Sequence, residues 1–299
     1  MEKMNIIKHL SMSIEELEQY YKELRKYNIE QNNPIKGVEL RKKINKTFLR
    51  VLKLVRFLNK QKLTILNDKR TETNKPKIFA VSHIGRYDIE IAQEVVKDPC
   101  FFVFGDPGDL YKNFDGLLLY IKGIIYLDTR DKEDRQIGYK TSVKALNQGT
   151  NILIFPEGAW NISPNEIIYK IFPGTIKMAL ETGAEIIPIA IEQYDNDYVV
   201  NIGENIVVDK NRTVKEQNDE LRDTLASLKW EIWEQKDLIK RADAGTYDEF
   251  LEGIMKDADN NVSVNEIHAT RYKFEKPDEI LNPNIEYNKD NAFLLKRNY

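Results

Sequence analysis

Cysteine is almost absent from this chain of 299 residues, and long apolar runs are missing altogether. The single cysteine, Cys100, excludes an intrachain disulfide and leaves too few thiolates for a structural zinc site, so we expect a buried structural thiol. No segment approaches the roughly 18 apolar residues of a membrane-spanning helix. The first residues, MEKMNIIKHL, lack the apolar stretch of a secretory signal. We therefore expect a protein that stays in the cytosol.

An excess of charge of one sign is also missing from the chain as a whole. Lys and Arg number 45 against 48 Asp and Glu, a net charge of -3 that excludes a globally basic nucleic-acid-binding protein. The charge is nevertheless unevenly spread, because residues 38–62 carry nine Lys or Arg and a single Glu. This segment holds a net charge of +8, which leaves -11 for the rest of the chain.

Residues 38–62 have the pattern of a basic amphipathic helix, with apolar and cationic residues on opposite sides. Two interpretations are open. The apolar stripe packs on the protein's own sheet beneath a solvated basic face, or the helix lies on an anionic lipid surface. The apolar residues at helical spacing are Ile44, Phe48, Val51, Val55 and Leu58, and the cations opposite them are Lys42, Lys46, Arg50, Lys53 and Lys60.

Short apolar segments alternate with helical patterns between residues 76 and 209, and this alternation predicts an α/β fold with a mostly parallel central sheet flanked by helices. Polar residues 67–77 predict a linker before the sheet. Residues 1–75, which include most of this linker, are expected to form an N-terminal region with amphipathic helices, and residues 210–299 a helical and irregular C-terminal extension. The predicted strands are 78–82, 101–104, 124–127, 151–155, 186–191 and 198–206, and the predicted helices between them are 88–97, 117–121, 134–148 and 175–181.

The first candidate for chemistry is the segment SHIGRYD, in which His83 and Asp88 lie between a predicted strand and a predicted helix. Open parallel sheets keep their sites at the C-terminal ends of strands. A histidine there can take a proton from a hydroxyl near neutral pH, and a carboxylate on the other ring nitrogen fixes its tautomer. The alternative is that Asp88 caps its helix and His83 is an ordinary loop residue.

The second candidate is Phe155-Pro156-Glu157-Gly158, again directly after a predicted buried strand. Glu157 is expected to accept hydrogen bonds from an acceptor's hydroxyls or to hold a cationic partner, and the amides near Gly158 are expected to face a developing oxyanion. The alternative here is turn chemistry alone, because Pro and Gly suit the second and fourth positions of a type I turn.

Together these two blocks, about 70 residues apart, resemble the glycerolipid acyltransferases, the group that includes 1-acylglycerol-3-phosphate acyltransferase. That family has a His-x4-Asp block, a Gly-containing block that ends in Asp-Arg, a Phe-Pro-Glu-Gly block and a late block around a proline. In this chain they correspond to His83 to Asp88, Gly123 to Asp128, Phe155 to Gly158, and Ile186 to Ile191. The resemblance covers roughly residues 76–206.

The resemblance implies a function. His83 deprotonates an acceptor hydroxyl, which attacks the thioester of acyl-CoA or acyl-carrier protein, and Asp88 orients His83. The expected partners are therefore an acyl thioester donor and a lipid acceptor, with no cofactor, metal or nucleic acid. No acyl-enzyme is implied, since the chain has no Gly-x-Ser-x-Gly. A lipid-handling family also favours the membrane interpretation of residues 38–62, peripheral on the inner face of the membrane.

The chain departs from the family at cationic positions that bear on recognition of a phosphate. Thr129 separates Asp128 from Arg130, and Ala159-Trp160-Asn161 replaces the usual Thr-Arg-Ser. Arg130, Arg135 or Arg86 would then have to supply the missing charge. The missing cations are consistent with an acyltransferase for a sugar or polyol acceptor without phosphate. A separate alternative is a catalytically silent member of the fold that binds lipid or a partner.

Overall fold

The computed structural model describes residues 6–85, 87–105, 111–112, 121–163, 166–235, 245–256 and 263–271. Within these ranges seven strands form a single sheet, in the order β1-β7-β6-β2-β5-β3-β4. The strands are β1 (Lys62–Asp68), β2 (Lys77–Val81), β3 (Cys100–Gly105), β4 (Ile124–Leu127), β5 (Asn151–Ile154), β6 (Glu185–Tyr194) and β7 (Asp197–Ile202).

The central strands are parallel, as the sequence predicts. β2 lies between β5 and β6, and β5 continues through β3 to β4, with every one of these pairs parallel. β7 turns back antiparallel to β6, and β1 pairs parallel to β7 at the edge. The prediction of a mostly parallel sheet is therefore confirmed, and the C-terminal ends of five strands share one edge.

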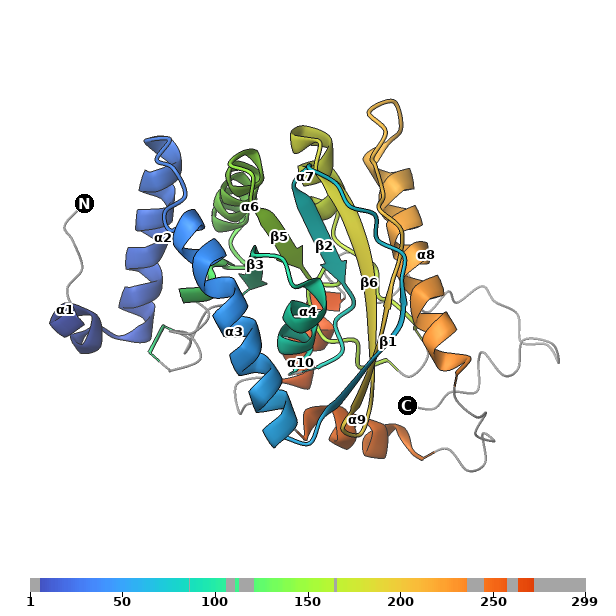
Figure 1. The fold of residues 1–299 in the computed structure, drawn as a ribbon. Coiled ribbons are helices and arrows are strands. Elements are labelled where there is room, and N and C mark those ends of the chain that lie inside the picture. The colour runs from blue at the N-terminus through green and yellow to red at the C-terminus, as the bar shows by residue number, and fades with distance from the viewer. Residues whose placement is uncertain are drawn as a thin grey trace, which may run out of the picture.

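Helices cover both faces of this sheet (Figure 1). Apolar residues of α6, α7 and α8 pack on one face, and those of α4 pack on the other, beside α3. Cys100 lies buried in the second of these clusters, and burial raises the pKa of its thiol to about 12. The helices are α1 (Ile6–Ser11), α2 (Ile14–Glu30), α3 (Val38–Leu58), α4 (Asp88–Val96), α6 (Lys132–Asn147), α7 (Gly174–Thr182), α8 (Val214–Trp233), α9 (Tyr247–Met255) and α10 (Val264–Arg271).

Strand β1 is the main difference from the sequence prediction. Residues 62–68 were expected in the helical N-terminal region and in the linker that follows it, yet they form an edge strand. The segment KLTILND contains β-favouring Thr64 and Ile65, but it is only half buried and pairs with one neighbour, so its apolar signal is weak. Most of the predicted helix 117–121 lies outside the described residues, and the domain boundary at residue 75 stays a prediction.

Helix α3 attaches to the rest of the protein largely through polar groups. Arg56 donates two hydrogen bonds of 2.9 Å to the carboxylate of Glu94 on α4, and the Asn45 amide donates to the Lys97 carbonyl at 2.7 Å. The expected apolar stripe does not pack fully on the sheet. Its outer residues are exposed, and large apolar side chains cluster along this solvent-facing side of the helix: Leu40, Val51, Leu54, Val55, Phe57 and Leu58.

Candidate active site

Two loops meet at the edge where the parallel strands end. One follows β2 and leads into α4, and the other follows β5 and leads into α7. The Ser82 hydroxyl extends the pairing of β2 with β6, because it accepts from the Ile191 amide at 2.9 Å. The Asn161 amide of the second loop donates to the His83 carbonyl at 2.8 Å. The backbone at His83 is therefore fixed by the Ser82 hydroxyl on one side and by the Asn161 amide on the other.

His83 and Asp88 are in direct contact. The Nδ1 of His83 lies 2.7 Å from the Oδ2 of Asp88, which also accepts from the amides of Ile84 at 2.8 Å and Gly85 at 3.1 Å. Asp88 is buried, at 1% exposure, in the first turn of α4. A single carboxylate oxygen thus shapes the loop and binds the imidazole. Asp88 does not cap its helix, because Tyr87 occupies the N-cap position of α4 and no side chain there forms a cap hydrogen bond.

The imidazole ring packs against two aromatic side chains and keeps part of its surface exposed. Phe155 stacks on it with ring centroids 4.3 Å apart and an interplanar angle of 23°, and Trp160 stands edge-on at 6.3 Å. The His83 side chain keeps 17% exposure. An ionised Asp88 selects the tautomer with hydrogen on Nδ1. The Nε2 lone pair, which no described residue hydrogen-bonds, is then available to accept a proton.

Glu157 lies buried beside this pair and binds two backbone amides. Its Oε1 accepts from the His83 amide and its Oε2 from the Tyr169 amide, both at 2.9 Å. The side chain is 2% exposed. Burial raises the pKa of this carboxyl, while the charge of Lys229 and the two amide bonds lower it. In this arrangement both oxygens hold loop backbone, and the expected contact of Glu157 with a substrate hydroxyl stays a prediction.

Gly158 closes the turn that carries Glu157. Its amide donates to the Phe155 carbonyl at 3.1 Å, as the turn interpretation predicts. Its φ is +71°, and a Cβ would lie 2.6 Å from the ring of Phe172. Only glycine fits this backbone conformation and close approach without strain.

Two of the three predicted phosphate-binding cations lie in the described part of the chain, where both contact the loop after β4. Arg130 is 72% exposed, and its Nε lies 3.5 Å from Asp128. Arg135 donates to the Thr129 carbonyl in the loop after β4. Arg86 lies outside the described residues.

Lys229 on α8 is a charged neighbour that the sequence analysis missed. It is 5% exposed, lies 3.5 Å from Glu192 at the end of β6, and sits 5.9 Å from the ring centroid of Trp233. Its positive charge also acts to lower the pKa of the Glu157 carboxyl. The signal was present in the sequence, because Lys229 follows Leu225 by four residues and so lies on the core-facing side of the helix.

The C-terminal helices reach the surroundings of the site. Trp160 packs in a small apolar cluster with Ile162 of its own loop and with side chains of α9 and α10, including Leu251 and Ile267. Since Trp160 also borders the His83 ring, these helices help to define the environment of the imidazole.

The fold and the site together define a class of protein. A histidine oriented by a buried carboxylate, at the C-terminal edge of a mostly parallel sheet, is a general-base site suited to activating a hydroxyl. Residues 62–192, somewhat less than half of the chain, match the family described as Acyltransferase. The resemblance to the glycerolipid acyltransferases is thereby confirmed.

Two individual proteins agree with the family assignment. The 1-acyl-sn-glycerol-3-phosphate acyltransferase of Borreliella burgdorferi is 32% identical over 89 residues, which are 30% of this chain and only 35% of that protein. The crystal structure of the 1-acyl-sn-glycerophosphate acyltransferase of Thermotoga maritima matches with a TM-score of 0.55 at 14% identity, over 74% of this chain and 91% of that chain. At this identity, the structural likeness shows a common fold.

Proposed function

We propose that the chain is an O-acyltransferase that moves a fatty acyl group from acyl-CoA or acyl-carrier protein to a hydroxyl of a lysophosphatidic acid-like acceptor. One observation carries the proposal: His83 Nδ1 lies 2.7 Å from Asp88 Oδ2, and the His83 side chain keeps 17% exposure. The family of residues 62–192 and the name of the Borreliella relative supply the reaction and the substrate class.

The geometry suggests a mechanism with His83 as general base. Nε2 takes the proton of the acceptor hydroxyl as its oxygen attacks the thioester carbonyl carbon. The tetrahedral intermediate then expels the thiolate, which receives that proton from the imidazolium, so the products are an ester and a free thiol. Asp88 stabilises the imidazolium without becoming protonated.

Glu157 acts in this scheme as a positioning residue. Its two hydrogen bonds tie the loop after β2 to the loop after β5. Proximity effects depend on small displacements of reacting groups, so a carboxylate that fixes the His83 backbone supports catalysis without contacting substrate.

The acceptor class can be tested by product analysis. The purified chain is incubated with acyl-CoA or acyl-carrier protein and with one of two matched acceptors, 1-acylglycerol 3-phosphate or the corresponding 1-acylglycerol. We expect ester formation on the phosphorylated acceptor, detected by mass spectrometry. Preference for the acceptor without phosphate would favour the sugar or polyol alternative. Absence of ester and of free thiol with every donor would favour a catalytically silent member of the fold.

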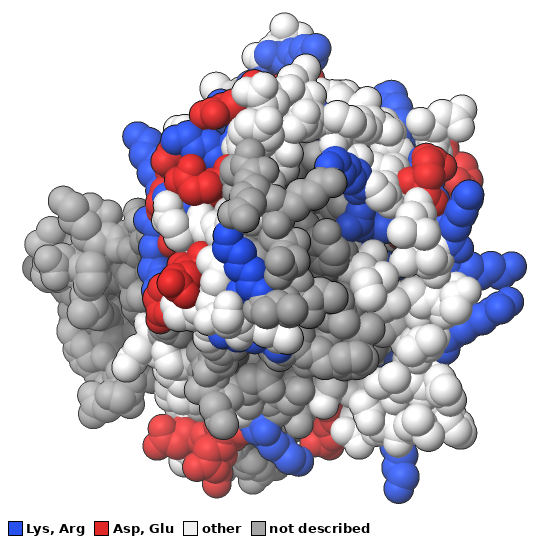
Figure 2. All heavy atoms as spheres, turned by 90° about the vertical axis from the view of Figure 1, so that its left-hand side faces the viewer, with Lys and Arg blue, Asp and Glu red and all other residues white. Residues whose placement is uncertain are grey.

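A second part of the proposal is that α3 binds the cytoplasmic face of an anionic membrane. No described helix combines the length and hydropathy needed to cross a bilayer. The outer side of α3 is apolar, with Leu54 56% and Leu58 66% exposed. Figure 2 shows Lys and Arg side chains projecting along the right-hand edge of the molecule, the side on which α3 lies. Apolar insertion and cationic attraction to lipid head groups would act together.

The double variant Leu54→Asn/Leu58→Asn should bind anionic vesicles at least about tenfold more weakly, because two side chains no longer insert into the apolar layer. Co-sedimentation with vesicles of phosphatidylglycerol and phosphatidylcholine measures this change. Val207→Asn is the matched control, since Val207 is 65% exposed but lies outside α3. Equal binding by the double variant and the control would contradict the membrane role of α3.

A further inference from the structure

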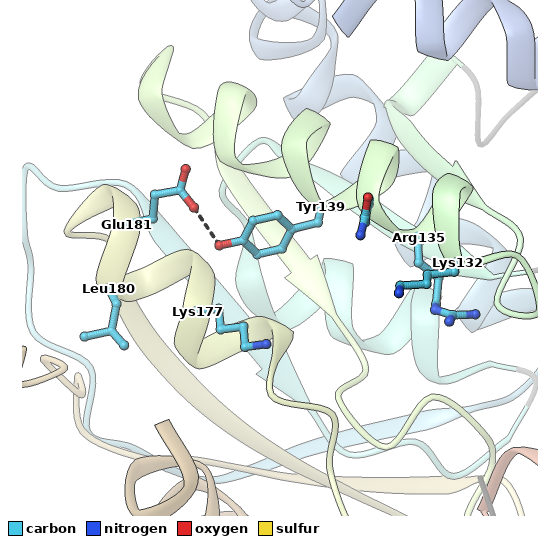
Figure 3. A pocket seen from close by; sticks show the side chains of 7 residues that line it. Lys132, Arg135, Tyr139, Lys177, Leu180 and Glu181 are labelled. Carbon is cyan, nitrogen blue, oxygen red and sulfur yellow. Dashed lines mark hydrogen bonds between the residues drawn. The ribbon is translucent and has the colours of Figure 1, made fainter. Parts of the chain in front are cut away.

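A concave site lies between α6 and α7 (Figure 3), and His83 is not among the residues that line it. Its cavity volume is about 580 Å³, within the usual range for small-molecule sites. Both helices start at the sheet edge that carries His83, since α6 follows β4 and α7 follows the loop that contains Glu157. The lining residues are Lys132, Arg135, Gln136, Tyr139, Lys177, Leu180 and Glu181.

Three cations line this groove, two of them at the end opposite Glu181 (Figure 3). Lys177 of α7 and Lys132 of α6 extend toward each other across it, with Arg135 next to Lys132 (Figure 3). Neither lysine forms an ion pair with any residue in the described part of the chain. The acidic residue of the groove, Glu181, accepts a hydrogen bond of 2.7 Å from the Tyr139 hydroxyl at the other end.

Helix stability does not explain the position of these lysines. Lys132 is the first residue of α6, and Lys177 lies in the first turn of α7. Cations in a first turn oppose the helix dipole, and two ammonium groups that face one another repel. An anion between them would offset both effects, and the amphipathic far end of the groove, with the Tyr139 ring and Leu180, suits an apolar or aromatic group.

We propose that this groove binds the nucleotide end of a coenzyme A thioester, with its phosphates between Lys132, Arg135 and Lys177 and its adenine along Tyr139. The inference rests on the proposed acyl transfer and selects one of its two donor classes. A carrier protein presents a single phosphodiester on its pantetheine arm, whereas coenzyme A carries three phosphates and an aromatic base, which match three cations and an aromatic wall.

Direct binding tests the groove without any turnover. Adenosine 3′,5′-bisphosphate should bind the full-length chain saturably in isothermal titration calorimetry, and Lys132→Glu/Lys177→Glu should weaken this binding at least tenfold. Lys140→Glu on the exposed side of α6 is the matched control and should bind as the parent does, since Lys140 does not line the groove. Thermal unfolding confirms that each variant is folded. No binding by the parent, or equal binding by the double variant, would overturn the proposal.

Kinetics then identify the donor. The double variant should raise the KM for acyl-CoA at least tenfold with little change in kcat, and should transfer from an acyl-pantetheine thioester, which lacks the nucleotide, as the parent does. A raised KM for acyl-carrier protein with an unchanged KM for acyl-CoA would overturn the nucleotide assignment. If the parent enzyme transfers from no donor, the proposed function fails, and the bisphosphate titration still decides whether the groove binds nucleotide.

Discussion

Replacing His83 with alanine should lower the rate of acyl transfer by at least about 10²- to 10⁴-fold, the usual contribution of a general base. The imidazole is the group that Asp88 orients at 2.7 Å, and the alanine variant has no other group at this position to accept the hydroxyl proton. Thiol release from the acyl donor, followed with a chromogenic thiol reagent, measures the rate. Lipid extracts from cells that express the parent or the variant should differ in the esterified product.

The control for this experiment separates chemistry from folding. His83 is partly exposed and its backbone bonds remain in the variant, so the thermal unfolding midpoint should change little. His9→Ala provides a matched histidine control, because His9 lies in α1 and hydrogen-bonds Tyr21 and the Tyr111 carbonyl. Transfer by His83→Ala at a tenth or more of the parent rate would show that the proton goes to another group.

Glu157→Gln should reduce both stability and transfer, although the two side chains have nearly the same shape. Both carboxylate oxygens accept backbone N–H groups, whereas glutamine has only one oxygen and would turn its NH₂ toward a second donor. A buried N–H without an acceptor costs about 1–3 kcal/mol. We expect a loss of this size in the free energy of unfolding, measured by urea denaturation, and a fall in kcat as the His83 loop shifts.

The comparison for Glu157→Gln is Glu220→Gln on the exposed side of α8, which should change the unfolding free energy by less than about 0.5 kcal/mol. A stability of Glu157→Gln equal to that of Glu220→Gln would mean that the two amide bonds contribute nothing. Retained stability with lost kcat would instead point to direct contact between Glu157 and the acceptor, as the sequence analysis expected.

The pH dependence of Glu157 has a defined sign. Burial raises its pKa above the usual 4.5 in the folded protein. The folded state therefore binds this proton more readily than the unfolded state, and the contribution of Glu157 to stability falls as pH rises from 4.5 through the raised pKa. Catalysis has the opposite requirement, because the ionised carboxylate accepts both amides. In Glu157→Gln, the pH dependence that the Glu157 carboxyl contributes should disappear from both the stability profile and the rate profile.

The sequence predicted the parallel core because its strands are apolar runs bounded by helical patterns. It also predicted that His83 and Asp88 share a strand-to-helix loop, and this spacing suffices because five residues at a helix start allow direct contact. The family resemblance could be stated for the same reason, since each of the two most informative blocks is a short continuous segment of the chain.

The remaining features depend on contacts that are distant in sequence. Glu157 is 74 residues from the His83 amide that it binds, and no local pattern distinguishes a carboxylate aimed at substrate from one that accepts main-chain N–H groups. Strand β1 gains its stability from β7, more than 130 residues later. Lys229 could have been found as a cation within a core-facing stripe, but its neighbour Glu192 comes from another element.

The packing of α9 and α10 on Trp160 and Ile162 has a practical consequence for shortened versions of this chain. A fragment trimmed to residues 62–192 would keep every recognisable motif and still leave the tryptophan beside His83 without its covering helices. It would also lack α8, whose leucines fill one side of the sheet. The smallest useful expression fragment therefore extends well past the late block around Pro188, to the end of α10.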